Sequence, residues 1–243
     1  MTQPIVPAQW SFFDRIYCIS LHDRPDRRNQ ARMAFARVGL ADRVQFVLVQ
    51  PHPTNSEQGI YESHMQCIRQ GVTANADTIL IFEDDVAFER FNAIRLGKCV
   101  DYLRQHNDWK VLFLGCLVKA SRSTGNTAIR KVKYRCLSHA YALNRPYARQ
   151  LLEKPWLDLP YDAVLGHFDK DWNGVYACYP SFAFQSDAIS DNLEHSRLDR
   201  FRRWCGGLRR IQRVDEWYHC HKWWIVALHL LIPGVILWLL FWK

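Results

Sequence analysis

TILIFEDD, the sequence of residues 78–85, is a short apolar run that ends on three carboxylates. Four consecutive apolar residues are typical of a buried strand, and acids at its end then lie at the rim of a sheet. Side chains two positions apart on an extended backbone point the same way, so Glu83 and Asp85 can converge on one divalent cation while Asp84 faces elsewhere. A solvated acidic turn is the alternative, because most exposed carboxylates bind nothing. The segments before and after this stretch must decide between the two.

The charge distribution argues against a nucleic-acid-binding protein. The formal net charge of the 243 residues is +8, but residues 197–222 carry eight Lys and Arg against three Asp and Glu. With Lys243 also set aside, residues 1–196 keep a net charge of only +2. Non-specific affinity for nucleic acid needs many phosphate contacts, so we expect no nucleic-acid partner. The eight cysteines form no Cys-x-x-Cys pair and therefore do not indicate structural zinc.

Residues 223–242 contain no formally charged side chain. As a helix they would span roughly 30 Å, the thickness of a bilayer's hydrocarbon core, with tryptophans at both ends. The segment predicts a C-terminal membrane anchor at 223–243, a basic neck at 197–222, and a catalytic domain at 1–196 that faces the cytoplasm. His229 and Pro233 argue against a simple span, so a re-entrant or interfacial hairpin and a buried core helix stay open as alternatives.

The order of apolar patterns predicts an α/β fold. In the first half, strands are expected at 15–21, 44–49 and 78–82, with helices at 27–38 and 60–70 between them. Such alternation is typical of a mostly parallel sheet flanked by helices. In the second half we expect a helix at 88–105, a polar loop at 121–126 that could close over a ligand, and strands at 111–117, 134–143 and 176–183.

Several short blocks lie in a fixed order along the chain. Residues 16–28 are IYCISLHDRPDRR, residues 59–64 are GIYESH and residues 79–86 are ILIFEDDV, and further blocks follow at 112–115, 139–143, 161–162 and 179–185. In this order they resemble glycosyltransferase family 25, the lipooligosaccharide and collagen galactosyltransferase family. The resemblance covers residues 15 to about 192. It departs from the family pattern at Ser20, where Asn is usual, and at Ile60, where Cys is usual.

The resemblance implies a GT-A-like, Rossmann-like fold and a UDP-sugar donor, with galactose the favoured sugar. It implies that the acids of residues 83–85 act like the Asp-x-Asp motif of such enzymes. A divalent cation with oxygen ligands neutralises a leaving diphosphate, so Glu83 and Asp85 are assigned to Mn²⁺ or Mg²⁺. Asp84 is expected at the donor sugar or ribose, and Arg27 and Arg28 at the nucleotide or diphosphate. Without this context, the two arginines fit a solvated helix start better.

The implied acceptor is a glycan or glycolipid such as lipooligosaccharide, and the implied reaction inverts the sugar's anomeric centre. The acceptor hydroxyl must lose a proton, and Asp162 is the predicted catalytic base, with a helix cap or loop acid as its alternative. Ser63 and His64 are expected at the donor, although a lone histidine is more often structural. Alternates for the base and the metal shell lie later in the chain, at Asp171, Asp191 and His195.

Two hypotheses from other classes use the same residues. In the first, the protein is a catalytically inactive membrane-bound binding module whose basic neck binds anionic lipid or a partner. In the second, it is a metal-dependent phosphoester hydrolase that uses the same acids. Neither hypothesis explains the ordered blocks from both halves of the chain, so the glycosyltransferase interpretation is preferred.

Overall fold

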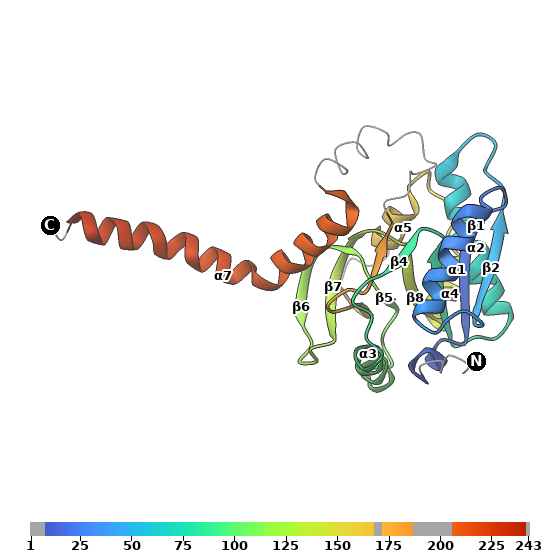
Figure 1. Ribbon diagram of the computed structural model, residues 1–243, viewed down its shortest axis with the longest axis horizontal. Coiled ribbons are helices and arrows are strands. Elements are labelled where there is room, and N and C mark those ends of the chain that lie inside the picture. The colour runs from blue at the N-terminus through green and yellow to red at the C-terminus, as the bar shows by residue number, and fades with distance from the viewer. Residues whose placement is uncertain (1–7, 168–171, 187–205, 242–243) are drawn as a thin grey trace.

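A mixed eight-stranded sheet forms the centre of the protein in the computed structural model, which describes residues 8–167, 172–186 and 206–241 (Figure 1). The strand order is β2-β1-β3-β8-β5-β9-β7-β6. The bounds are β1 Arg15–Leu21, β2 Val44–Val49, β3 Thr78–Glu83, β5 Val111–Phe113, β6 Leu117–Ser123, β7 Ile129–Cys136, β8 Ala140–Asn144 and β9 Val175–Cys178. Two short strands, β4 (Val86–Phe88) and β10 (Ala183–Gln185), pair antiparallel as a separate two-stranded sheet.

The expectation of a mostly parallel sheet is corrected to a mixed one. Strand β1 is parallel to β2 and β3, and β5 is parallel to β9, but β8 is antiparallel to both β3 and β5. Strand β7 is antiparallel to β6 and β9. The reason is that residues 114–144 contain no helix, and strands joined without a crossover helix run antiparallel. Part of the expected loop at 121–126 is accordingly strand, since β6 extends to Ser123.

Helices cover both faces of the large sheet. One apolar cluster joins the sheet to η1 (Ala8–Phe12), α1 (Pro25–Arg37) and α3 (Ala93–Gln105). The other cluster joins the opposite face to α2 (Ser56–Thr73), α4 (Arg145–Leu152) and α5 (Tyr161–His167). Strand β3 lies between these layers with Ile79 to Phe82 fully buried, as its apolar sequence predicts. The carboxylates that follow are thereby fixed to the most buried part of the sheet.

Helix α7 (Gly207–Phe241) packs its first turns against the domain and then extends away from it (Figure 1). The membrane-spanning helix predicted at 223–243 needs correction, because no helix within the described residues is long and apolar enough to cross a membrane. The segment is the second half of a 35-residue helix with a charged first half. Its tryptophans and His229 carry polar ring N–H groups, which lowers its apolarity.

Candidate active site

A cavity of about 400 Å³ opens where strands β1, β2 and β3 end. The carboxyl ends of neighbouring parallel strands meet at one edge, which is where α/β proteins commonly bind ligands. The volume falls within the range of small-molecule pockets. Seven of the eight predicted site residues line it, namely Arg27, Ser63, His64, Glu83, Asp84, Asp85 and Asp162. Arg28 is the exception.

The three acids reach the cavity by a turn and not by strand alternation. Strand β3 ends at Glu83, and Asp84 and Asp85 form the turn that leads into β4. Alternation of side chains holds only within the strand, so it does not set the direction of Asp84. Asp84 lines this cavity and also a second one beside α1 and β4, and its Oδ1 lies 3.6 Å from Arg27 Nη1. Residues 83–85 all line one cavity, and their carboxylates are close enough for their charges to act on one another.

Glu83 is 28% exposed and lies beside side chains from α2 and from the loop between β7 and β8. Ser138 Oγ donates a hydrogen bond of 3.3 Å to its Oε1, and His64 Nε2 lies 3.5 Å from the same oxygen. Burial and, after it, the negative charge of Asp162 raise the pKa of Glu83 to about 7. Glu83 therefore holds a proton at neutral pH more readily than a solvated glutamate does.

Asp85 is held on one side and open on the other. Gln185 Nε2 donates a 2.6 Å hydrogen bond to Oδ2, whereas the buried Oδ1 has no hydrogen-bond partner among the described residues. Burial and then the negative charge of Glu83 raise the pKa of Asp85 to about 7. A buried acceptor without a donor is costly, and a bound cation would remove that cost.

The donor set at the acids fits a cation shared with a ligand. No group of three or more His, Cys, Asp or Glu side chains arranged to hold a metal occurs within residues 8–167, 172–186 and 206–241. Mg²⁺ and similar hard cations at nucleotide sites commonly use one or two carboxylates and complete their shell with phosphate oxygens and water. Glu83 and Asp85 provide carboxylates of this kind on one cavity wall.

His64 is a buried, neutral histidine in a hydrogen-bonded series. Its Nδ1 lies 3.0 Å from the hydroxyl of Tyr141, which in turn lies 2.7 Å from the hydroxyl of Tyr161. The His64 ring also stacks on the Tyr161 ring at a centroid distance of 3.9 Å. Burial lowers the pKa of His64 to about 3, so the ring carries no charge at neutral pH. His64 is thus a neutral neighbour of Glu83, with Nε2 3.5 Å from Oε1, and its hydrogen bond is to Tyr141.

Two adjacent arginines at the start of α1 point in different directions. Arg27 Nη1 lies 3.6 Å from Asp84 Oδ1, and both side chains are largely buried at the cavity wall. Arg28 instead donates to the carbonyl oxygens of Leu21 and His22, at 2.5 and 3.0 Å. Arg28 therefore closes the turn between β1 and α1, and it does not line the cavity.

Two residues of the GIYESH block, Gly59 and Ser63, make structural contacts within and around α2. Ser63 Oγ donates to the carbonyl oxygen of Gly59 at 2.6 Å, so its hydroxyl hydrogen is used within the helix. A Cβ atom on Gly59 would lie 2.8 Å from Cβ of His52, which is closer than such atoms approach one another. Gly59 thus lets the loop before α2 approach the helix, and His52 lines the same cavity.

Asp162 lies in the first turn of α5, and its carboxylate is anchored by two donors. Tyr134 donates its hydroxyl to Oδ1 at 2.5 Å, and the backbone N–H of Leu137 donates to Oδ2 at 3.0 Å. Each carboxylate oxygen has a second lone pair, so both can accept one more hydrogen bond from a ligand. The alternates Asp171, Asp191 and His195 lie outside the described residues.

Residue-level reasoning did not assign three neighbours of the acids to the site. Gln185 and Ser138 bond the carboxylates directly, and Tyr134 holds Asp162. Gln185 ends the YPSFAFQ block, so the order of blocks contained a signal for it. No local pattern marks Ser138 or Tyr134, because their contacts depend on where β7 and β8 lie in the sheet, with β5 and β9 between them.

Comparison with known proteins agrees with the geometry. Residues 49–165 match the model of glycosyltransferase family 25, described as an LPS biosynthesis protein. A glycosyltransferase 25 family member of Aedes aegypti is 23% identical over 248 aligned positions, which cover 82% of this chain and 41% of that protein. The chain thus spans less than half the length of this relative.

Two solved structures are similar at a lower level. The crystal structure of A197 from STIV has 12% identity and a TM-score of 0.42, covering 72% of this chain and 86% of that one. A glycosyltransferase involved in glycosylation of the major capsid of PBCV-1 has 11% identity and a TM-score of 0.39, covering 63% and 74%. These scores alone assign no fold family. The match of residues 49–165 to the family 25 model, together with the Aedes aegypti relative, confirms the resemblance seen in the ordered blocks.

Proposed function

We propose that the protein is a glycosyltransferase that moves a sugar from a UDP-sugar to a hydroxyl of a glycan or glycolipid acceptor. The observation that carries the proposal is the single cavity in which the family 25 domain gathers Glu83, Asp84 and Asp85. Galactose is the proposed sugar and a lipooligosaccharide-type glycan the proposed acceptor, by analogy with the family and with its description as an LPS biosynthesis protein.

Glu83 and Asp85 are proposed to hold Mn²⁺ or Mg²⁺ against the diphosphate of the donor. When bound, such an ion neutralises the charge that develops on the leaving diphosphate. The buried Oδ1 of Asp85 supports this role, since it has no hydrogen-bond donor from the described residues. Neutral His64 and the Ser138 hydroxyl orient Glu83 from behind, and fixed neighbours of this kind strengthen a metal site.

Arg27 and Asp84 are proposed to position the donor, and Asp162 to act on the acceptor. The Arg27 guanidinium lies at the cavity wall, where it can bind a phosphate oxygen or orient Asp84 toward the sugar or ribose. Asp162 is the proposed base that takes the acceptor hydroxyl's proton, and Tyr134 fixes its direction. The acceptor oxygen bonds the anomeric carbon as the bond from that carbon to the diphosphate oxygen breaks and UDP leaves, and this single displacement inverts the anomeric carbon. Arg28 has no proposed ligand role, because its guanidinium is used by two carbonyl oxygens.

A thermal-shift measurement with UDP-galactose and Mn²⁺ tests the proposal. A ligand that binds only the folded protein at one hundred times its Kd stabilises it by about 2.7 kcal/mol, so the melting temperature rises. We expect this rise with UDP-galactose plus Mn²⁺, a smaller rise with other UDP-sugars, and none for Asp85→Asn. The matched control Asp101→Asn removes an exposed carboxylate from α3 and should keep the full response.

Two results would contradict the proposal. The first is a wild-type protein whose melting temperature does not respond to any UDP-sugar with Mn²⁺. The second is an Asp85→Asn variant that responds as the wild type does and transfers galactose at a similar rate.

A further inference from the structure

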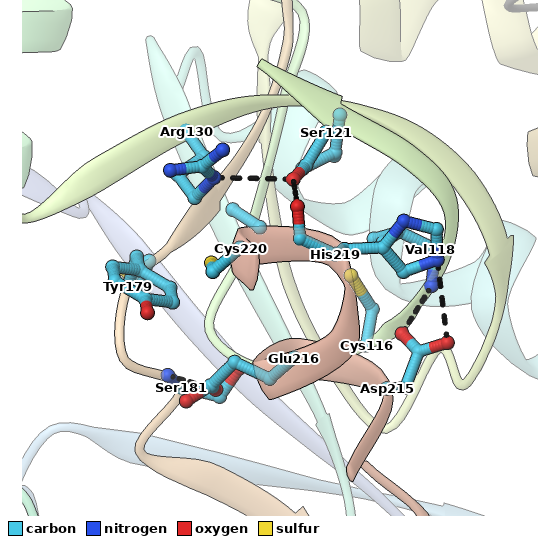
Figure 2. A pocket seen from close by; sticks show the side chains of 13 residues that line it. Cys116, Val118, Ser121, Arg130, Tyr179, Ser181, Asp215, Glu216, His219 and Cys220 are labelled. Atoms are coloured by element: carbon cyan, nitrogen blue, oxygen red, sulfur yellow. Dashed lines mark hydrogen bonds and ion pairs between the residues drawn. The ribbon is translucent and has the colours of Figure 1, made fainter. Parts of the chain in front are cut away.

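The first turns of α7 present one continuous face to the rest of the domain. Gln212, Asp215, Glu216 and His219 recur at the three- and four-residue spacing of a helix face. Asp215 accepts a hydrogen bond of 3.0 Å from the backbone N–H of Val118 in β6, and Glu216 accepts one of 2.7 Å from Ser181. Figure 2 shows these two contacts on either side of a small cavity beneath the helix. This part of α7 is therefore bonded to the domain.

The same face of α7 also holds strand β10. Gln212 is completely buried, and its Nε2 donates a 3.0 Å hydrogen bond to the carbonyl oxygen of Ala183. Arg209 Nε lies 3.4 Å from the carbonyl oxygen of Gln185 at the other end of the strand. Arg209 and Arg213 both form ion pairs with Glu89, which follows β4, the partner strand of β10.

The approach of α7 to β10 is close enough to require a glycine beneath it. A Cβ atom on Gly115 would lie 1.9 Å from the carbonyl oxygen of Ala183 and 2.6 Å from Nε2 of Gln212. Both distances are far below any van der Waals contact, so only glycine allows the three segments to meet. Gly115 is the last residue of the LFLG block at 112–115, so close packing explains the glycine at the end of that block.

Strand β10 in turn fixes Asp85. Gln185 Nε2 donates to Oδ2 of the Asp85 carboxylate at 2.6 Å, and the backbone N–H of Ser186 donates to the Asp85 carbonyl oxygen at 2.7 Å. Side chain and main chain of Asp85 are thus held by two consecutive residues. Oδ2 already accepts this hydrogen bond, whereas Oδ1 has no partner among the described residues, so Oδ1 is the oxygen with both lone pairs open to a cation.

We propose that Gln185 and Gln212 are positioning residues for Asp85, and that residues 207–219 of α7 act as a clamp that sets the direction of its carboxylate. The inference rests on the proposed metal-dependent function, and it adds a C-terminal helix outside the matched family domain to the machinery of the site. The clamp works through two hydrogen bonds in series, from Gln212 to Ala183 and from Gln185 to Asp85. Partners of this kind, one step behind a metal ligand, typically contribute 10- to 100-fold to metal affinity.

Gln212→Met and Gln185→Met test the two bonds separately. Methionine keeps the length and approximate volume of glutamine but removes the amide N–H, so the packing around it is retained. The matched control is Arg210→Met, which lies on the exposed side of the same helix. The first measurement is the affinity for Mn²⁺ in the presence of UDP, by calorimetry. We expect about tenfold weaker binding for both glutamine variants and less than about a twofold change for Arg210→Met.

The second measurement uses no ligand, so it tests the clamp even where the proposed function fails. Hydrogen–deuterium exchange of peptides covering residues 181–186 should be faster in Gln212→Met than in the wild type and in Arg210→Met. Absence of Mn²⁺ and UDP binding by the wild-type protein would overturn the proposed function, and the exchange rates would then decide the clamp alone.

The possible results distinguish the hydrogen bond made by Gln212 from the one made by Gln185. Unchanged exchange and unchanged Mn²⁺ affinity in a folded Gln212→Met variant would overturn the role of α7. Weaker binding in Gln185→Met alone would leave Gln185 as the positioning residue and remove Gln212. Where Gln212→Met does not fold, Gln185→Met carries the affinity test, since Gln185 is only partly buried, and an unchanged affinity there would overturn the proposal.

Discussion

Replacing Asp85 by asparagine should stabilise the metal-free protein at alkaline pH and leave it almost unchanged at acidic pH. The cause is that burial and the charge of Glu83 raise the pKa of Asp85 from 3.8 to about 7. The folded protein therefore keeps this proton to higher pH than the unfolded chain does. The stability contributed by the protonated group is fully present below the unfolded pKa and is lost as the pH rises through the folded pKa.

The size of the effect follows from the shift. Each pKa unit is worth about 1.4 kcal/mol, so the ionised Asp85 costs the folded protein on the order of 4 kcal/mol above pH 7. Between pH 5 and pH 8 the free energy of unfolding of the wild type should therefore fall by about 3 kcal/mol relative to that of Asp85→Asn. The amide introduced by Asp85→Asn does not ionise and can still accept the hydrogen bond from Gln185, so the variant isolates the charge.

Urea unfolding of metal-free protein in EDTA, at several pH values from 5 to 8, measures the difference in the free energy of unfolding. The gain in Asp85→Asn should grow with pH and level off above pH 7. The control Asp101→Asn corrects for the loss of one exposed charge. A gain that stays within about 0.5 kcal/mol across the whole range would refute the argument that burial and Glu83 hold a proton on Asp85.

Two further substitutions test the packing and the binding roles of the blocks. Gly115→Ala should lower the free energy of unfolding by about 1 to 3 kcal/mol, because its Cβ would overlap the carbonyl oxygen of Ala183. Urea unfolding measures the change, and a variant as stable as the wild type would contradict the close contact. Ser63→Ala should change transfer rate less than about threefold, because Ser63 donates its hydroxyl hydrogen to Gly59, and a hundredfold loss in a UDP-galactose assay would instead make it a ligand-binding residue.

Local sequence patterns were sufficient for the half of the fold that carries the acids. Strands β1, β2 and β3 have the predicted positions because each is a short, largely apolar run, although β2 forms the edge of the sheet while β1 and β3 lie inside it. The cavity at their ends follows from parallel pairing of these three strands. The cluster of predicted residues around it was therefore accessible from the sequence.

The remaining features depend on contacts between distant parts of the chain. Nothing near Arg28 indicates that it bonds two carbonyl oxygens while Arg27 reaches the cavity. Strand β8 lies between β3 and β5 and is antiparallel to both, which its composition does not reveal. The residues before 223 have the composition of a charged linker, yet Gln212 is completely buried, because helix faces are selected by the surface they meet.

Helix α7 can dock on the domain only late in synthesis, because it is the last helix of the chain to be translated. Translation proceeds from the N-terminus, so every strand of the sheet leaves the ribosome before Gln212 does. The nascent domain can pair β1 to β3 and form the walls of the cavity while Asp85 still lacks its clamp. If the proposed clamp operates, a chain without α7 keeps the hydrogen bond from Gln185 to Asp85 but lacks the one from Gln212 to Ala183, and it should bind Mn²⁺ more weakly than the complete protein. Newly synthesised protein arrested before residue 207 should therefore have a folded sheet and a weaker affinity for Mn²⁺ and UDP than the complete protein.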